Sequence, residues 1–170
     1  MVQMPEYLYH VNGKDGVIGR IERNDAHARK LLHRAGVVLV FDFRQRVCLA
    51  RRSLKKAIFP GCIDSVCSFH VKHGQTYPEA AMEELFEETG FKAEPKYIGK
   101  FLLDEDPDRM IVAVFSLVTG ERPSLDPAEA ASCEFYNHDD AGRLMKNGKT
   151  TPWLLGAWNL YKKMQDQEGG

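Results

Sequence analysis

The chain has almost no charge imbalance, because its 170 residues include 23 lysines and arginines against 24 aspartates and glutamates, a formal net charge of −1. It therefore lacks the strong basic field that would attract a nucleic-acid polymer or an anionic membrane surface. It also lacks any apolar run close to the ~20 residues that a membrane-spanning helix requires. We accordingly expect neither nucleic acid nor a membrane as a partner.

Cysteines are few. Cys48, Cys62, Cys67 and Cys133 are the four, and no two of them have the C-x-x-C spacing of a zinc or redox site. The chain is not so small that it needs disulfide bonds. The N-terminal residues MVQMPEYLYH lack the charged start and apolar core of a signal peptide. These features predict a reducing, cytoplasmic location, ordinary buried thiols and no structural zinc.

Neither a low-complexity tract nor a repeat at a fixed period interrupts the sequence. The length suits one domain, and we predict a single domain over residues 1–170. Residues 1–34 are expected to form an N-terminal extension with strands and a short helix, and residues 166–170 are expected to fray. A domain of this size buries roughly 70 % of its unfolded surface, which is enough for a hydrophobic core.

The remaining pattern alternates strands and helices, which predicts an α/β protein in which helices cover both faces of a mixed sheet. Residues 59–67 read as a loop that runs into a strand, and 37–43 with 47–52 read as a hairpin about Arg44-Gln45. The expected strands are 7–11, 17–23, 37–43, 47–52, 96–103, 110–118 and 133–136. The expected helices are 25–33, 77–89, 138–146 and 152–165.

The segment EAAMEELFEETG, residues 79–90, contains five glutamates and no lysine or arginine. Thr76 and Glu79 have the spacing of a capping box, and Gly90 can supply a left-handed C-terminal cap. On a helical wheel the residues separate into two faces. The face expected to pack inward carries Ala81, Met82, Leu85, Phe86 and Thr89. The opposite face carries Glu83, Glu84, Glu87 and Glu88.

That carboxylate face is unfavourable by itself. Like charges at i, i+3 and i+4 cost a few tenths of a kcal/mol each, and Glu87 and Glu88 lie in the last turn, where the helix dipole disfavours anions. A divalent cation would offset these costs, because Mg²⁺ and Mn²⁺ prefer oxygen ligands. A solvated acidic face without any metal remains the alternative interpretation.

The stretch Glu84-Leu85-Phe86-Glu87-Glu88-Thr89-Gly90-Phe91 resembles the end of the Nudix box. The family pattern is G-x5-E-x7-R-E-U-x-E-E-x-G-U, where U is bulky and apolar. Six of its nine specified positions match, namely Glu84, Leu85, Glu87, Glu88, Gly90 and Phe91. The box in this register covers residues 69–91, and it departs from the pattern at Phe69, Gln75 and Glu83.

This resemblance implies a Nudix-type α/β/α sandwich with a mixed β-sheet, and an enzyme that hydrolyses a nucleoside diphosphate linked to another group. It implies that Glu84, Glu87 and Glu88 bind Mg²⁺ or Mn²⁺, and that one of them can also act as the catalytic base. A further catalytic carboxylate commonly comes from a later loop in the family, and Glu129 is the best-placed candidate. The resemblance also leaves a homodimer open.

The chain is most similar to the branch of the family that includes isopentenyl-diphosphate isomerase. ARRSLKKAIFPG (50–61) resembles the basic segment of that branch, which implies that Arg52 and Lys56 bind diphosphate. His27, His33 and His70 lie near the metal-binding histidines of the isomerase, and His70 can instead contact a phosphate. The cysteine position of the isomerase falls on Ser68, however, and its catalytic glutamate position falls near Met110.

The three departures bear on activity. Phe69 replaces a glycine, Gln75 replaces a glutamate, and Glu83 replaces the arginine that orients a catalytic glutamate in the family. The last change should weaken the site or recruit a compensating lysine or arginine from elsewhere. Three functions therefore remain in order of expectation: a Mg²⁺-dependent pyrophosphohydrolase, a degenerate Nudix domain that binds a nucleotide or a protein partner, and the isomerase.

Overall fold

The apolar run AGVVLVF belongs to the central strand of the structure, a computed structural model that describes residues 2–169. This strand, β3, extends from His33 to Phe41 and is buried over nearly its whole length. A continuous apolar strand is expected where a sheet is covered on both faces. The prediction of a strand over 37–43 was therefore correct in kind but wrong in its bounds.

Both edges of β3 are paired. Strand β8 (Asp108–Val118) runs parallel to it along its full length. The other edge is shared by three antiparallel strands in turn: β1 (Tyr7–Val11) at the start of β3, β6 (Cys67–His70) in the middle, and β4 (Val47–Arg52) at the end. The predicted hairpin of β3 and β4 thus pairs only at Phe41 and Val47.

The remaining strands extend this core into a nine-stranded mixed sheet. Strand β2 (Val17–Glu22) pairs with β1, and β7 (Lys96–Glu105) pairs with β8. Strands β5 (Ile63–Ser65) and β9 (Ala130–Tyr136) both pair with β4. The N-terminal strands are consequently part of the same sheet as the rest of the chain.

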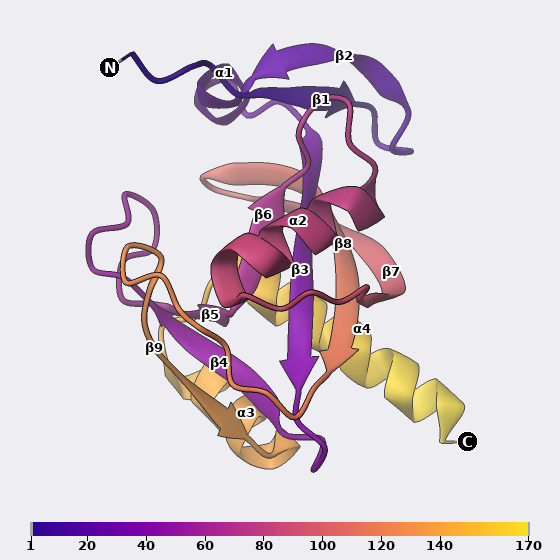
Figure 1. Cartoon of the computed structure of the whole chain (residues 1–170). Coiled ribbons are helices and arrows are strands. Elements are labelled where there is room, and N and C mark those ends of the chain that lie inside the picture. Colours follow the sequence, from indigo (N-terminus) through magenta and orange to yellow (C-terminus); the bar gives the residue numbers. More distant parts are fainter. Residues whose placement is uncertain (1, 170) are drawn as a thin grey trace.

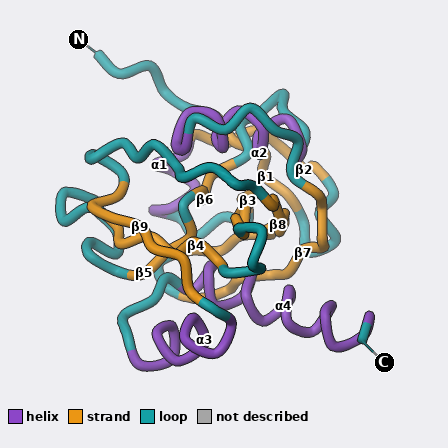
Figure 2. The backbone as a smooth tube through the Cα atoms, turned by 60° about the horizontal axis from the view of Figure 1, so that its bottom comes forward, coloured by secondary structure: helices purple, strands orange, loops and turns teal. Residues whose placement is uncertain are grey.

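Helices cover both faces of the sheet (Figures 1 and 2). Helix α2 (Tyr77–Thr89) packs over β6 and β3, and α4 (Pro152–Glu168) packs on the other face over β7, β3 and β8. Helix α3 (His138–Asn147) lies against β4 and β9, and the short α1 (Arg23–Ala28) follows β2. The predicted α/β/α sandwich with a mixed sheet is confirmed.

None of the helices within residues 2–169 is long and apolar enough to cross a membrane.

Alternate side chains of β3 enter two separate cores, as the two-residue period of a strand requires. Val37 and Leu39 pack with residues of α4 such as Trp158. Val38 and Val40 pack with Leu85 and other residues of α2. The sheet is thereby fixed between its two helical layers.

The segment before β3 differs from its prediction. A helix was expected over 25–33, but α1 ends at Ala28 and His33 is already the first residue of β3. Lys30 has a left-handed φ of 50°, which ends the helical path. The strand begins early because His33 pairs with both neighbours, His10 of β1 and Met110 of β8.

Other bounds differ as well, most of them by one or two residues, and three segments differ by more. The segment 59–67 yields two strands, β5 and β6, separated at Val66. Strand β9 begins at Ala130, three residues earlier than expected, because it pairs with β4 along its length. Helix α4 continues to Glu168, into the segment that was expected to fray.

Candidate active site

Both ends of α2 form as its sequence predicts. The Thr76 hydroxyl accepts the Glu79 backbone N–H at 3.3 Å, and the Glu79 carboxylate accepts the Thr76 backbone N–H at 2.8 Å. Gly90 ends the helix in the left-handed conformation, with φ of 80°. The caps fix the length of the helix and the direction in which it enters the fold.

The inward face of α2 differs from the predicted one. Met82 and Phe86 were expected to pack inward, but they are 43 % and 48 % exposed. Glu84 and Glu88 are partly buried instead. The small side chains of Ala80–Ala81, both fully buried, let the helix approach the sheet on their side and turn the two glutamates inward.

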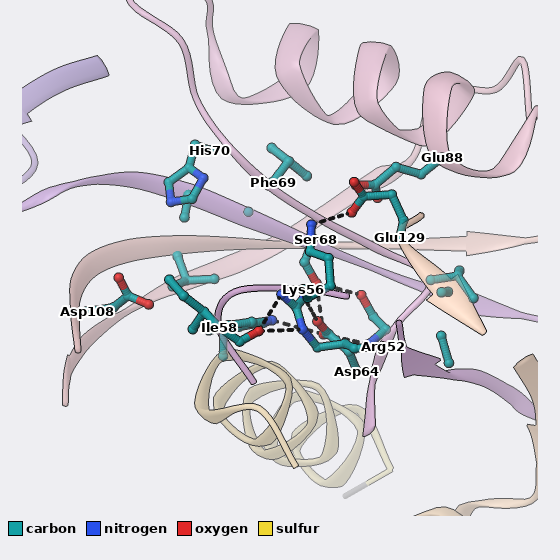
Figure 3. A pocket seen from close by; sticks show the side chains of 18 of the residues that line it. Arg52, Lys56, Ile58, Asp64, Ser68, Phe69, His70, Glu88, Asp108 and Glu129 are labelled. Atoms are coloured by element: carbon teal, nitrogen blue, oxygen red, sulfur yellow. Dashed lines mark hydrogen bonds and ion pairs between the residues drawn. The ribbon is translucent and has the colours of Figure 1, made fainter. Parts of the chain in front are cut away.

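The four glutamates of the predicted carboxylate face do not form one group. Oxygen atoms of Glu83, Glu84 and Glu87 lie within 4.8 Å of one another, with Glu83 and Glu87 exposed and Glu84 partly buried. Glu88 points into a cavity, where its carboxylate lies beside that of Glu129 (Figure 3). The predicted set of Glu84, Glu87 and Glu88 therefore extends from the surface into the cavity.

The electrostatics of Glu84 and Glu88 favour a bound cation. Burial raises the pKa of Glu88 well above its usual range, and the nearby charges of Glu84, Glu129 and Asp64 raise it further. Burial also raises the pKa of Glu84, against the opposing charge of Lys72. Carboxylates that repel one another in a desolvated position are hard oxygen donors, and such a donor set fits Mg²⁺ or Mn²⁺.

Arg52 forms part of the cavity wall and is held from several sides. Its Nη1 donates to Asp64 Oδ2 at 2.9 Å, and its Nη2 donates to the carbonyl of Ile58 at 3.0 Å. The guanidinium group also lies over the Trp153 ring, 5.5 Å from the centroid. These contacts fix the position of a positive charge at the cavity before any ligand arrives.

Asp64 is the centre of a buried hydrogen-bond network. Its carboxylate accepts hydrogen bonds from the Ser68 hydroxyl at 2.9 Å, the Thr151 hydroxyl at 3.2 Å and Trp153 Nε1 at 2.9 Å. It is 2 % exposed, and burial raises its pKa. The sequence analysis overlooked this residue. The available signal was a single charged side chain within the otherwise uncharged segment 62–68.

Lys56 also lines the cavity, and its Nζ is 2.7 Å from Glu129 Oε2. The structure thus brings together two residues that the sequence predicted separately, one as a phosphate ligand and one as a carboxylate. Arg51 and Lys55, the other members of the basic segment, are exposed and do not line the cavity. Only Arg52 and Lys56 of the four can meet a ligand there.

A cluster of three histidines lies beside the same cavity. Ring nitrogens of His27, His33 and His70 are within 4.8 Å of one another. His33 Nδ1 donates to the Leu31 carbonyl at 2.8 Å, and His27 Nδ1 is 2.6 Å from Asp108 Oδ1. A carbonyl oxygen can only accept, so Nδ1 of His33 carries the proton and its Nε2 keeps a free lone pair.

Two of these histidines, the buried His33 and the half-buried His70, each have a buried ring nitrogen without a hydrogen-bond partner among the described residues. In both rings this nitrogen is Nε2. Burial lowers the pKa of both, and that of His70 falls well below its usual range. Neutral imidazoles with free nitrogens are the form that binds metals.

The cavity connects these groups and has a volume of about 230 Å³. In Figure 3 Glu88 and Glu129 lie on one side of the cavity, His70 and Asp108 lie on the other, and Arg52 lies beside Asp64, below Glu129 in this view. Its apolar wall includes Ile58, Val66, Met110, Val112 and Leu125. The structure therefore places His70 away from the two cations with which the sequence grouped it.

Strand β6 decides which side chains face the cavity. Ser68 lines it, whereas Cys67 is fully buried in the core under α2. Burial raises the pKa of Cys67 well above its usual range, and the charges of Glu88 and Glu84 raise it further. Cys67 is consequently a thiol rather than a reactive thiolate. Met110 lines the cavity without an ionisable group.

Comparison with known proteins identifies the family. The NUDIX domain profile matches residues 31–155. The chain belongs to the Nudix family. A protein of Pseudomonas aeruginosa that is named as an uncharacterized Nudix hydrolase is 31 % identical over 157 residues, 92 % of this chain and 93 % of that protein.

A second sequence relative and a solved structure are also similar to this chain. An isopentenyl-diphosphate Delta-isomerase of Serratia proteamaculans is 30 % identical over 166 residues, 92 % of this chain and 89 % of that protein. A crystal structure from Deinococcus radiodurans has a TM-score of 0.79 at 23 % identity, and covers 92 % of this chain and 98 % of that chain. The chain is thus an enzyme of the Nudix hydrolase family, and the structural likeness supports the fold.

The Nudix box departures at Gln75 and Glu83 are linked in the structure. Lys72 Nζ is 2.6 Å from Glu83 Oε1, and Gln75 Nε2 donates to Glu83 Oε2 at 2.8 Å. The same ammonium group lies 3.6 Å from Glu84 Oε1. Glu83 thus has a lysine beside it, as one of the two outcomes expected for this departure requires, although nothing in the sequence distinguished Lys72 from other lysines.

The departure at Phe69 is matched by Gly36. Phe69 lies in β6 opposite Gly36 of β3, and its ring occupies the space in which a side chain at position 36 would begin. A Cβ built on Gly36 would be 2.2 Å from the Phe69 ring. The loss of the Nudix box glycine is therefore accommodated by a glycine on the neighbouring strand.

Proposed function

We propose that this Nudix protein is a Mg²⁺- or Mn²⁺-dependent pyrophosphohydrolase that cleaves a diphosphate linkage in a nucleoside diphosphate derivative. The arrangement of the cavity carries the proposal. Glu88 and Glu129 place two carboxylates at one end, and Arg52 and Lys56 place two cations next to them. Carboxylates can hold a metal and accept a proton, while the cations bind phosphate oxygens.

In this proposal Glu84, Glu87 and Glu88 hold the metal. When bound, a divalent cation neutralises diphosphate oxygens and polarises an attacking water. Glu88 also serves as the base in this proposal, because its carboxylate faces the cavity beside Glu129, where the attacking water would lie. Arg52 is already oriented by Asp64, so it can bind a phosphate oxygen with little rearrangement.

The Lys56–Glu129 ion pair suggests how a substrate completes the site. Within residues 2–169 the Lys56 ammonium group forms one ion pair, with Glu129. A diphosphate that enters the cavity would offer it a second anionic partner. Movement of Lys56 toward the phosphate would release Glu129, which can then accept a proton from the attacking water. His70, at the far end of the cavity, is proposed to contact the rest of the substrate.

A panel assay tests the proposed function. Phosphate and pyrophosphate release is measured from nucleoside diphosphate derivatives with Mg²⁺ or Mn²⁺, for the wild type beside Glu88→Gln. Metal-dependent turnover that falls by about a hundredfold or more in the variant would support the hydrolase. Absence of turnover together with thermal stabilisation by the metals would instead indicate a domain that binds without catalysis.

The histidine cluster favours one second candidate, the isomerase reaction on isopentenyl diphosphate. His27, His33 and His70 offer nitrogen ligands for a metal beside the same cavity. The buried thiol of Cys67 and the position of Met110 weigh against it. Incubation with isopentenyl diphosphate and Mn²⁺ in D₂O, followed by NMR, decides the question. Migration of the double bond, lost in His33→Gln, would establish the isomerase.

A further inference from the structure

Lys72 lies on the loop between β6 and α2, and its ammonium group lies close to two glutamates of the helix. Nζ is 2.6 Å from a Glu83 oxygen and 3.6 Å from a Glu84 oxygen. Within residues 2–169, no other lysine or arginine lies within 4.0 Å of the carboxylates of Glu83, Glu84 or Glu87. One cation therefore contacts two of these three neighbouring carboxylates, Glu83 and Glu84.

The backbone that carries Lys72 is held by the N-terminal strand. Lys72 forms an antiparallel bridge with Leu8 of β1. The next residue, His73, donates its backbone N–H to the carbonyl of Tyr7 at 2.8 Å. The loop is thus attached to the sheet immediately beside the lysine, and β1 helps to determine where the ammonium group lies.

Gln75 connects this lysine to the helix through its amide group. Its Oε1 accepts the backbone N–H of Lys72 at 3.1 Å, and its Nε2 donates to Glu83 at 2.8 Å. The glutamate that the Nudix pattern specifies at position 75 would repel Glu83 and could not donate to it. Gln75 and Glu83 are therefore compatible with each other and with the lysine.

We propose that Lys72 is a positioning residue for the metal-binding carboxylates, and that it supplies from the loop the positive charge that the Nudix box places on the helix at position 83. Glu83 anchors the ammonium group, and the ammonium group orients Glu84. This inference rests on the proposed function, in which Glu84 is a metal ligand. Exposed ion pairs contribute little to stability, so removal of Lys72 should alter the site while the protein stays folded.

The test moves the positive charge of Lys72 to another position by mutation. Lys72→Met, Lys72→Arg and the double variant Lys72→Met/Glu83→Arg are compared with the wild type, and Lys146→Met on α3 is the control for loss of an exposed lysine. We expect Lys72→Met to lower kcat by about tenfold or more with little change in KM. We expect Lys72→Arg and the double variant to recover most of that loss, because each restores a cation beside Glu84.

A second readout does not depend on turnover. The EPR line shape of bound Mn²⁺ reports the arrangement of its ligands, and it should change in Lys72→Met and return in the double variant. An unchanged line shape and kcat in Lys72→Met, or no recovery in the double variant, would overturn the role of Lys72. If the wild type binds Mn²⁺ but hydrolyses nothing, the proposed function fails and the line shapes still decide the role of Lys72. A wild type that binds no Mn²⁺ would overturn both.

Discussion

Asp64 and Arg52 show how much of the site depends on single buried charges. Their side chains are only 3 % and 14 % exposed, and their charged atoms are 2.9 Å apart. Removal of one partner from a buried ion pair leaves the other charge desolvated and unpaired. The two residues should therefore depend on each other for stability as well as for the shape of the cavity.

This dependence gives a prediction for a double-mutant cycle. Asp64→Asn should lower the free energy of unfolding by about 3 kcal/mol, because it leaves the Arg52 charge without its partner. Arg52→Gln in the Asp64→Asn background should cost much less than Arg52→Gln alone. Urea unfolding of the four proteins measures the coupling. Purely additive costs would show that the two side chains do not stabilise each other.

For individual residues of the site, the sequence predicted which residues take part better than it predicted their contacts. Glu88, Glu129, Arg52 and Lys56 were predicted from the resemblance, and all four line one cavity. Their pairing was not predictable, because the Lys56–Glu129 contact joins residues that are 73 positions apart. Single side chains that complete a buried network, as Asp64 does, have no periodic pattern in the sequence that would reveal them.

Among the elements, α2 shows where sequence reasoning succeeds and where it stops. Its bounds and both caps were predicted correctly, because capping depends on local residues. Its inward face was predicted wrongly, because a helical wheel ranks residues by apolarity while the sheet selects the side on which small residues permit close contact. The actual orientation of α2 about its axis turns Glu88 into the cavity. The wrongly predicted feature is therefore the helix face that carries a proposed metal ligand.

The contact between β3 and β6 gives a second prediction. Gly36→Ala would place a methyl group against the Phe69 ring and should lower the free energy of unfolding by about 2 kcal/mol. In a Phe69→Ala background the same change should cost little, since the space is then free. Chemical denaturation of the two pairs checks this. An equal cost in both backgrounds would mean that Phe69 does not explain the glycine.

For the whole molecule, Asp15 joins the turn between β1 and β2 to the rest of the fold. Its carboxylate lies 2.7 Å from Arg34 Nε, 2.7 Å from Lys100 Nζ and 3.0 Å from the Tyr77 hydroxyl. Burial acts to raise the pKa of Asp15, but the hydrogen bonds from these three residues outweigh burial and hold it below its usual value. The N-terminal strands are thus tied to β3, β7 and α2 at one point.

A depressed carboxyl pKa stabilises the folded state above the unfolded pKa of about 3.9, and the contribution disappears as the pH falls through the folded pKa. Asp15→Asn tolerates the left-handed φ of 64° at this position and removes only the charge. We expect it to lower the free energy of unfolding by about 2 kcal/mol at pH 7. The difference from the wild type should shrink below about pH 4. A difference that is equally large at pH 3 would contradict this account.

The sandwich and its mixed sheet were predictable from the alternation of elements and from the Nudix resemblance. The pairing of β3 with β1, β6 and β8 was not, because those partners come from other parts of the chain, whereas its contact with β4 had been predicted as a hairpin. The same pairing explains the histidine cluster, since His27 lies near the end of α1, His33 begins β3 and His70 ends β6. A resemblance had placed these histidines near a metal, and the sheet is what brings them together.

The central claim is that the cavity promotes attack of water on phosphorus. The most direct measurement is mass spectrometry of the products formed from the best substrate of the panel with Mg²⁺ in H₂¹⁸O. The account predicts ¹⁸O in a phosphate product of the wild type and no labelled product above background from Glu88→Gln. A wild type that yields no labelled phosphate would contradict it.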